Sequence, residues 1–443
     1  MNLSSLRLPA ACAALFLLFS PCHAQWTGVR DAVRADRELA CGPDLLYRFD
    51  APSPTAPPPG YEAVYVSHYG RHGSRYAYTS KTYTVVEAAL SRGAEEGNLT
   101  PYGEQVWEAF KVFYAHAEHR VGDLTRKGWE QQRGIASTML HMFPGAFPAG
   151  ARIDACVSPS FRSTLSMTSC CLALGQLRPD LEIYEHQSVV DIPATRPNMS
   201  NPFAPESVAP PCPVTETPED FMLRTVDWRT ILSRLFKDPD KALGKYTPWQ
   251  MMDYLYMLVA GMGSVDDAVA LDLSGIFPGE DFIRMWEADN YLRFREYYDY
   301  LASCCQVYED IIAKADARLA ARERGADLRF GHDHVFLTLL MIAGMDGFGR
   351  FPDRADDVAL YFQNFRSPMS ANLQLAFFRP ASRADLRPVL VQILVNGREL
   401  RHLGDPSPAV GPESTPGATL PGPFFEWETL KAWLTGRFAM YKK

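Results

Sequence analysis

The sequence has 443 residues, of which 47% are hydrophobic and 22% charged, a balance typical of a folded globular protein. This length allows one large domain with an insertion, or two domains. The formal net charge of −8 at pH 7 argues against nucleic acid as a general partner. An anionic small molecule remains compatible with this charge. Exposed charges are screened beyond about 8 Å at physiological salt, so a few arginines inside a cleft act locally.

The first 24 residues have the pattern of a secretory signal peptide. Arg7 supplies a positive charge, residues 9–19 form a short apolar run, and Ala24 offers a small residue at the cleavage position. No later segment has the uninterrupted apolar length of a transmembrane helix. We therefore expect an exported protein, periplasmic or secreted, with no transmembrane segment in the mature chain. A surface lipoprotein attached through Cys22 fits less well, because Pro21 precedes it.

Two of the nine cysteines lie in this segment, which leaves seven in the rest of the chain. An oxidising compartment would allow disulfides, but an odd number leaves at least one thiol unpaired. Their spacing does not match a zinc finger or ribbon. The seven are Cys41, Cys156, Cys170, Cys171, Cys212, Cys304 and Cys305.

Strand and helix patterns alternate in the first half of the chain. A proline-rich segment at residues 51–60 leads into an apolar strand at residues 62–66. A helix begins after Thr125, a plausible N-cap, and runs to about Phe143. The next expected elements are a strand at 152–157, a helix at 160–177 and a strand at 181–184. This alternation predicts an α/β fold in which helices cover a sheet.

The pattern changes after about residue 195. A proline-rich loop at residues 193–218 precedes a region from 218 to 324 that is helical throughout, with one long helical pattern over 291–324. We interpret this region as a helical insertion that caps the sheet. The expected units are a signal peptide at 1–24, a first part of the α/β core at 25–195, the insertion at 196–321 and a second core part at 322–443.

Strand patterns return in the last part of the chain. A strand at 327–330 precedes an apolar helix at 335–345. Two further strands, at 371–378 and 388–395, precede Asn396-Gly397, a dipeptide typical of a tight hairpin turn. The expected elements end with an amphipathic helix at 426–441.

Four segments with chemically active residues fall at the ends of expected strands or the starts of expected helices. The segment Arg71-His72-Gly73-Ser74-Arg75 follows the first strand closely, and Gly331-His332-Asp333 follows the strand at 327–330. Arg162 lies near the start of a helix, and residues 124–128 begin another. In open α/β sheets, ligands bind outside the carboxyl ends of the strands. A histidine between two arginines at such an edge favours a phosphate ligand.

In this order the four segments resemble the histidine acid phosphatases. That family has Arg-His-Gly-x-Arg near its N-terminus and His-Asp, or His-Ala-Glu in one branch, near its C-terminus. Tyr76 after Arg75 is similar to the multiple inositol polyphosphate phosphatase branch. The resemblance extends from Val64 to about Leu403 and is weak in the helical insertion. It implies a histidine-phosphatase-like core sheet flanked by helices, with a helical cap. It also implies hydrolysis of phosphate monoesters through a phosphohistidine, on inositol polyphosphates such as phytate.

The first half of such a site consists of the arginines and His72, and their roles follow from the chemistry of a phosphate monoester. A phosphate monoester is a dianion near neutrality and repels nucleophiles until its charge is neutralised. Arg71, Arg75 and Arg162 can supply this neutralisation through charge-assisted hydrogen bonds. The same cations keep His72 neutral, and the neutral imidazole can attack phosphorus. Gly73 removes a side chain where the backbone has to approach closely.

The second half of the site is the motif His332-Asp333-His334 near the C-terminus. We expect Asp333 to protonate the leaving oxygen and later to activate water, and His332 to bind the transferring phosphate. The motif departs from the inositol polyphosphate branch, because His334 stands where the donor glutamate would fall. His334 is therefore the second choice for the donor and otherwise a substrate-binding residue. Ala77 also replaces a proline that is common in the family. The chemistry requires no metal or organic cofactor.

Three alternatives remain open from the sequence. A broad-specificity acid phosphatase acting on sugar phosphates would share all these residues and differ only in the walls of the pocket. An exported phospholigand-binding protein could keep the arginines and lack turnover. His332 and His334 could instead be two ligands of a metal ion, although no other residues show matching ligand spacing. In each case the expected partner is a phosphorylated small molecule.

Overall fold

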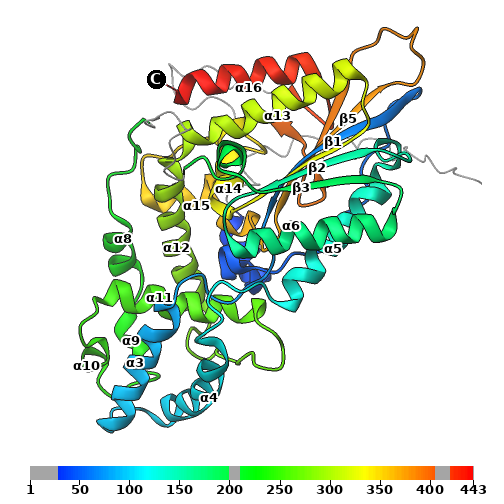
Figure 1. Ribbon diagram of the computed structural model, residues 1–443. Coiled ribbons are helices and arrows are strands. Elements are labelled where there is room, and N and C mark those ends of the chain that lie inside the picture. Colours follow the sequence, from blue (N-terminus) through cyan, green and yellow to red (C-terminus); the bar gives the residue numbers. More distant parts are fainter. Residues whose placement is uncertain (1–27, 199–209, 405–419, 443) are drawn as a thin grey trace, which may run out of the picture.

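The computed structural model describes residues 28–198, 210–404 and 420–442, so the expected signal peptide lies outside the described residues. An eight-stranded mixed sheet in the order β10-β6-β5-β1-β4-β2-β3, with β7 paired to β6, forms the centre of the molecule (Figure 1). The strands are β1 (Tyr61–Arg71), β2 (Arg152–Val157), β3 (Glu182–His186), β4 (Gly325–Gly331), β5 (Asn372–Pro380), β6 (Leu390–Val395), β7 (Arg398–Glu399) and β10 (Phe424–Glu426). This arrangement confirms the expected α/β core sheet.

The register of the sheet brings distant segments to one edge. β1 and β4 are parallel, and Arg71 at the end of β1 pairs with Gly331 at the end of β4. β2 is parallel to β4 on its other side, where Val157 pairs with Phe330. The residues that follow these three strands therefore leave the sheet side by side.

Helices cover both faces of the sheet (Figure 1). One face carries α5 (Arg126–Met142) and α6 (Phe161–Leu177), and the other carries α13 (Leu301–Ala321), α14 (Asp333–Ala343) and α16 (Trp427–Tyr441). Successive side chains along β4 point to opposite faces of the sheet, and each side chain suits the helices that cover its face. Leu328 and Phe330 join the apolar core under α5 and α6. The buried Arg329 between them donates from Nε to Asp310 of α13 at 2.6 Å.

A helical part lies beside the sheet (Figure 1). It contains α3 (Lys81–Glu95), α4 (Pro101–Ala117), α8 (Pro218–Thr225), α9 (Trp228–Leu232), α10 (Pro239–Leu243) and α11 (Pro248–Gly261). α3 packs against α4 and α11, although α3 and α4 precede the expected insertion in the chain. α12 (Glu280–Tyr298) joins this part to the core by packing against α11 and α14. The division of the chain at residues 195 and 321 stays a prediction.

A helix cap and a hairpin turn follow the sequence pattern. Thr125 caps α5, because its side chain accepts a hydrogen bond from the Gly128 amide. Asn396 and Gly397 have φ values of 52° and 77°, which confirms the tight turn between β6 and β7. The long helical pattern over 291–324 falls on two helices rather than one. α12 ends at Tyr298 and α13 begins at Leu301, so a break separates them.

The seven cysteines that follow the expected signal peptide all lie in the described residues and are free thiols. Five of them are buried. In the described part of the chain, every helix is too short or too polar to cross a lipid bilayer.

Candidate active site

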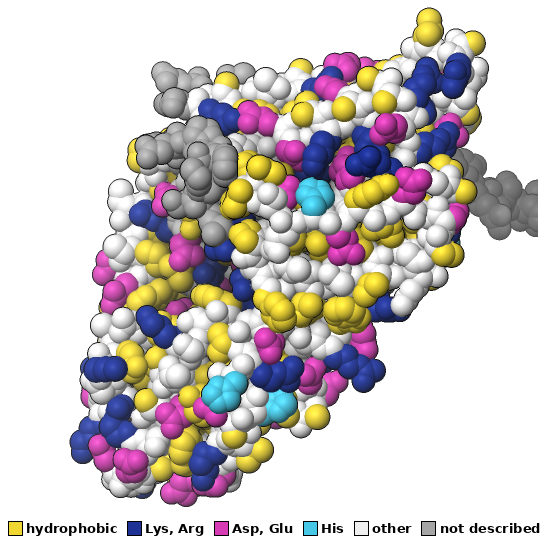
Figure 2. Space-filling view, in the orientation of Figure 1, with side chains coloured by type: hydrophobic (Ala, Val, Ile, Leu, Met, Phe, Trp, Pro, Cys, Tyr) yellow, Lys and Arg dark blue, Asp and Glu magenta, His cyan; other side chains and the backbone are white. Residues whose placement is uncertain are grey.

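A cavity of about 270 Å³ opens where β1, β2 and β4 end, between the sheet and the helical part. Figure 2 shows a hollow in this region with Lys and Arg side chains at its bottom. Six of the seven residues expected in the site line this cavity, and Arg71 lies beside it. The six are His72, Arg75, Arg162, His332, Asp333 and His334.

His72 directly follows β1 and is hydrogen-bonded to the neighbouring strand. Its amide donates to the Gly331 carbonyl at 3.1 Å, which ties it to the end of β4. The ring is buried, and Nδ1 lies 3.0 Å from the Gly73 carbonyl oxygen. Burial, followed by the charges of Arg162 and Arg71, holds the pKa of His72 well below its usual value. The imidazole is therefore neutral. Because a carbonyl only accepts, Nδ1 carries the proton and Nε2 keeps a free lone pair.

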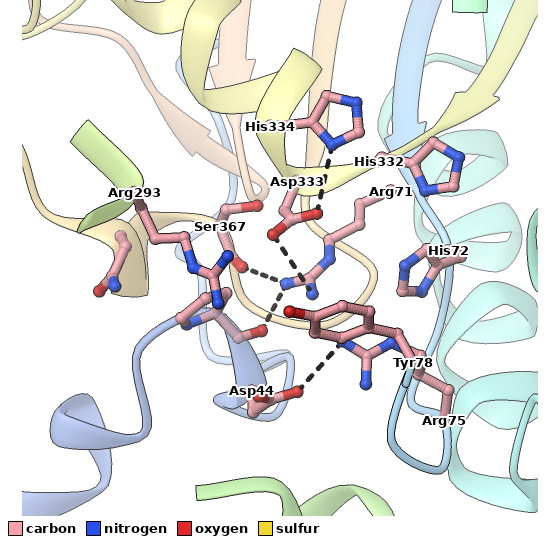
Figure 3. Close-up of polar contacts among 12 residues, drawn as sticks. Asp44, Arg71, His72, Arg75, Tyr78, Arg293, His332, Asp333, His334 and Ser367 are labelled. Carbon is pink, nitrogen blue, oxygen red and sulfur yellow. Dashed lines mark hydrogen bonds and ion pairs between the residues drawn. The ribbon is translucent and has the colours of Figure 1, made fainter. Parts of the chain in front are cut away.

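Arg71 is fully buried beside the cavity (Figure 3). Its Nη1 donates to the carbonyl oxygens of Ser367, at 2.6 Å, and Pro43. Its Nη2 lies 3.9 Å from Oδ2 of Asp333. Among the described residues, neither Nη2 nor Nε has a hydrogen-bond partner. A buried guanidinium with unused donors is a strong anion ligand, because burial leaves it poorly solvated.

Arg75 and Arg162 reach the cavity from two other elements. Nη2 of Arg75 lies 3.5 Å from Oδ1 of Asp44, and its guanidinium lies 5.2 Å from the centre of the Tyr78 ring. Arg162 comes from the first turn of α6, and its Nη2 lies 3.5 Å from Nδ1 of His332. Burial lowers the pKa of Arg162 to about 10, and Nε has no hydrogen-bond partner in the part of the chain that the structure describes. The Arg162 guanidinium therefore stays charged at neutral pH.

His332 stands directly opposite His72. The two ring centres are 5.6 Å apart, and Nε2 of His332 lies 3.0 Å from Oγ of Ser158. Burial is the main reason that the pKa of His332 lies well below its usual value, and Arg162 adds to the effect. His332 is therefore neutral as well. Because the Arg162 guanidinium can only donate, the single ring proton of His332 lies on Nε2, which faces Oγ of Ser158.

Asp333 and His334, the two possible proton donors, differ clearly. Burial raises the pKa of Asp333, but Arg71 and other neighbours outweigh it, so the carboxyl pKa lies well below its ordinary value. Burial lowers the pKa of His334 to about 4. Nε2 of His334 lies 3.0 Å from Oδ1 of Asn198, and its ring stacks on His332 at 5.3 Å. His334 is thus a neutral ring packed against its neighbours, while Asp333 presents a carboxylate beside Arg71 (Figure 3).

No protein-family model matches the sequence, and no curated protein matches it either. Solved structures do match the fold. The multiple inositol polyphosphate phosphatase of Bifidobacterium longum in complex with inositol hexasulfate superposes with a TM-score of 0.66 at 16% identity, covering 89% of this chain and 97% of the other. The chain has the histidine acid phosphatase fold. A phytase from D. castellii gives a TM-score of 0.63 at 14% identity, covering 91% of this chain and 85% of the other.

One wall of the cavity in this histidine acid phosphatase fold was not foreseen from the sequence. It consists of Asp289, Arg293, Glu296 and Tyr297 of α12, which we call the α12 wall. Arg293 lies 3.2 Å from Asp289 through Nε and donates to Glu296 from Nη1 at 3.1 Å. Burial raises the pKa of Asp289 to about 7. The sequence does contain a pattern for this wall, because Asp289, Arg293 and Tyr297 are spaced four residues apart and so share a helix face.

Arg196, which follows the short helix α7 (Ile192–Thr195), is a further cavity residue that the sequence did not single out. It is the first residue of the expected insertion and has no surrounding motif, so nothing local marks it. Among the described residues, no group of three or more His, Cys, Asp and Glu side chains could hold a metal ion.

Proposed function

We propose that this protein is a phosphate monoester hydrolase that works through a phosphohistidine at His72. One observation carries the proposal: a buried, neutral His72 with a free Nε2 shares a cavity with Arg75, Arg162 and Asp333, and Arg71 lies beside it. The cations suit a phosphate dianion and the imidazole suits attack on phosphorus. The likeness in fold to the phosphatases supports this assignment.

In the first step, the arginines bind the phosphate oxygens and the lone pair of His72 Nε2 forms a bond to phosphorus. The bond to the leaving oxygen breaks, its electron pair stays on that oxygen, and Asp333 supplies the proton that converts it to an alcohol. In the second step, Asp333 takes a proton from water as the water oxygen bonds to phosphorus. The N–P bond then breaks, and its electron pair returns to Nε2.

Asp333 has to be protonated before the first step. Arg71 holds its pKa low in the free protein. A phosphate dianion bound to Arg71 offsets this charge, so the pKa of Asp333 rises when substrate binds. Protonation of the donor is therefore coupled to occupation of the site, which favours activity in mildly acidic solution.

For the substrate we propose inositol polyphosphates such as phytate. Arg71, Arg75 and Arg162 suffice for one phosphate, and Arg196 and Arg293 add cations around the same cavity. The Bifidobacterium longum structure of the same fold holds inositol hexasulfate, a densely charged inositol. One observation favours the broad-specificity alternative. Glu296 pairs with Arg293 and so offsets the charge of one cation on the wall that further phosphates would meet.

The test of the reaction is release of p-nitrophenol from p-nitrophenyl phosphate. His72→Ala should lose at least about 10³-fold in kcat, because it removes the nucleophile. His119→Ala, which changes an exposed histidine, should retain wild-type activity. A wild-type protein that binds inorganic phosphate without turnover would support the phospholigand-binding alternative. Activity that disappears on exhaustive chelation and returns with added metal would support the metal alternative.

The test of the substrate compares phosphate release from phytate with release from glucose phosphates under the same conditions. Inositol specificity predicts a higher kcat/KM for phytate, because its additional phosphates meet Arg196 and Arg293. A strong preference for the sugar phosphates would contradict the inositol assignment and leave the phosphohistidine chemistry intact.

A further inference from the structure

Asp333 makes a hydrogen bond that crosses from the sheet core to the α12 wall. Tyr297 donates from Oη to Oδ2 of Asp333 at 2.9 Å. Asp333 is the first residue of α14, whereas Tyr297 lies in the last turn of α12. The proton donor and its partner therefore come from elements that pack against each other.

Tyr297 is fixed in place on several sides. Its side chain is 3% exposed, and its ring lies 6.3 Å from that of Phe362 and 6.1 Å from that of His334. Oγ1 of Thr338 in α14 donates to the His334 carbonyl at 2.6 Å and lies 3.4 Å from the Tyr297 carbonyl oxygen, so the backbone of α12 packs closely against the helix that carries Asp333. Burial, together with the charge of Asp333, holds the pKa of Tyr297 well above its usual value. The phenol therefore keeps its proton and acts as a donor at every working pH.

The bond distinguishes the two oxygens of the Asp333 carboxyl group. Oδ2 accepts from Tyr297 and lies 3.9 Å from Nη2 of Arg71. Oδ1 accepts no hydrogen bond from a described residue, and it lies 3.9 Å from Nδ1 of His334. With Oδ2 occupied, Oδ1 is the oxygen available to carry the transferable proton. General acid catalysis needs this oxygen within hydrogen-bond reach of the leaving oxygen.

We propose that Tyr297 is a positioning residue, which holds Oδ2 of Asp333 so that Oδ1 faces the leaving oxygen. This inference rests on the proposed function. When the P–O bond breaks, its electron pair stays on the leaving oxygen, and the proton passes to that oxygen from Oδ1 while Tyr297 keeps its own proton. In the second step, Oδ1 receives the proton of the attacking water, so the hydrogen bond to Tyr297 is unchanged over the cycle.

The experiment is Tyr297→Phe, which removes only the hydroxyl, assayed with two esters. Glycerol phosphate releases a strongly basic alkoxide that needs a proton, whereas 2,4-dinitrophenyl phosphate releases a weak base that needs little help. The measured quantity is kcat/KM, because it covers only the steps through P–O cleavage. We expect a loss of about tenfold or more with glycerol phosphate, within the range that general acid catalysis contributes, and less than about threefold with dinitrophenyl phosphate.

Two controls make the result specific. Tyr298→Phe changes the next residue, whose ring packs against Phe351 at 4.9 Å, and it should leave both values unchanged. In an Asp333→Asn background, Tyr297→Phe should cause no further loss with glycerol phosphate, because the group it positions is already absent.

Equal losses with both esters would overturn the inference, because they would make Tyr297 a structural or binding residue. An unchanged kcat/KM with glycerol phosphate would overturn it as well. Either result leaves the phosphatase assignment standing, since that assignment fails only if the wild-type protein has no activity or if His72→Ala retains it.

Discussion

The charge state of one histidine decides whether the proposed chemistry works in mildly acidic solution. An ordinary histidine is mostly protonated below about pH 6.5 and then has no lone pair for attack. His72 is buried among Arg71, Arg75 and Arg162, and its pKa is displaced downward. A lowered pKa is what the chemistry needs, because the His72 ring then stays neutral from pH 6.5 down to the lowered pKa. The arginines thus serve both the phosphate and its nucleophile.

We predict that His72 stays neutral at pH 5 in the free protein. Nitrogen-15 chemical shifts of the imidazole, assigned by their absence in His72→Ala, report the protonation state directly. Arg162→Met should raise the midpoint of the His72 titration, because it removes the neighbouring cation that lowers the pKa of His72 most. A midpoint near 6.5 in the wild-type protein would contradict the electrostatic account.

At the scale of elements, the loop after β1 fits closely against the start of α5. A Cβ atom on Gly73 would lie 2.5 Å from the Gly128 carbonyl oxygen and 2.6 Å from its Cα. Both atoms belong to backbone, which cannot move without shifting α5. The same loop is held by Gln132, which donates from Nε2 to the Arg71 carbonyl at 3.0 Å. The sequence interpretation of Gly73 as a site of close approach is therefore correct, with a helix as the neighbour.

We predict that Gly73→Ala displaces the loop and lowers kcat/KM by about tenfold or more, since small misplacements of reacting groups are costly. Overpacking should also lower the free energy of unfolding by about 1–3 kcal/mol. Gly175→Ala in α6 is the matched control, because its Cβ would lie 3.7 Å from Ile183, an ordinary contact. Chemical denaturation and steady-state kinetics of both variants measure these effects. Wild-type kinetics in Gly73→Ala would contradict the account.

At the scale of the whole molecule, the sequence predicts the sheet better than the helical part. The strands are recognisable as short apolar runs between turn residues. Because ligands bind outside the carboxyl ends of the strands, the strand pattern alone predicts that His72 and His332 lie at the same edge of the sheet. No bounds were predicted for the helices α3 and α4, which join a helical part that lies mainly later in the chain. Packing between segments distant in sequence determines that association.

The same reason explains why the α12 wall was missed. A helical pattern shows which residues share a face, but it does not show which face meets a cavity. The packing of α12 against α14 is what places Asp289, Arg293 and Tyr297 on the cavity. The hydrogen bond from Tyr297 to Asp333 joins residues 36 positions apart and has no local sequence signal.

The central claim is that phosphate passes through His72 before it reaches water. The stereochemical course at phosphorus tests it most directly. A phosphorothioate ester made chiral with oxygen-18 can be hydrolysed in oxygen-17 water, and the configuration of the released thiophosphate compared with that of the ester. Two successive in-line displacements, first by His72 and then by water, predict overall retention of configuration. Overall inversion would show a single direct attack by water and would contradict the account.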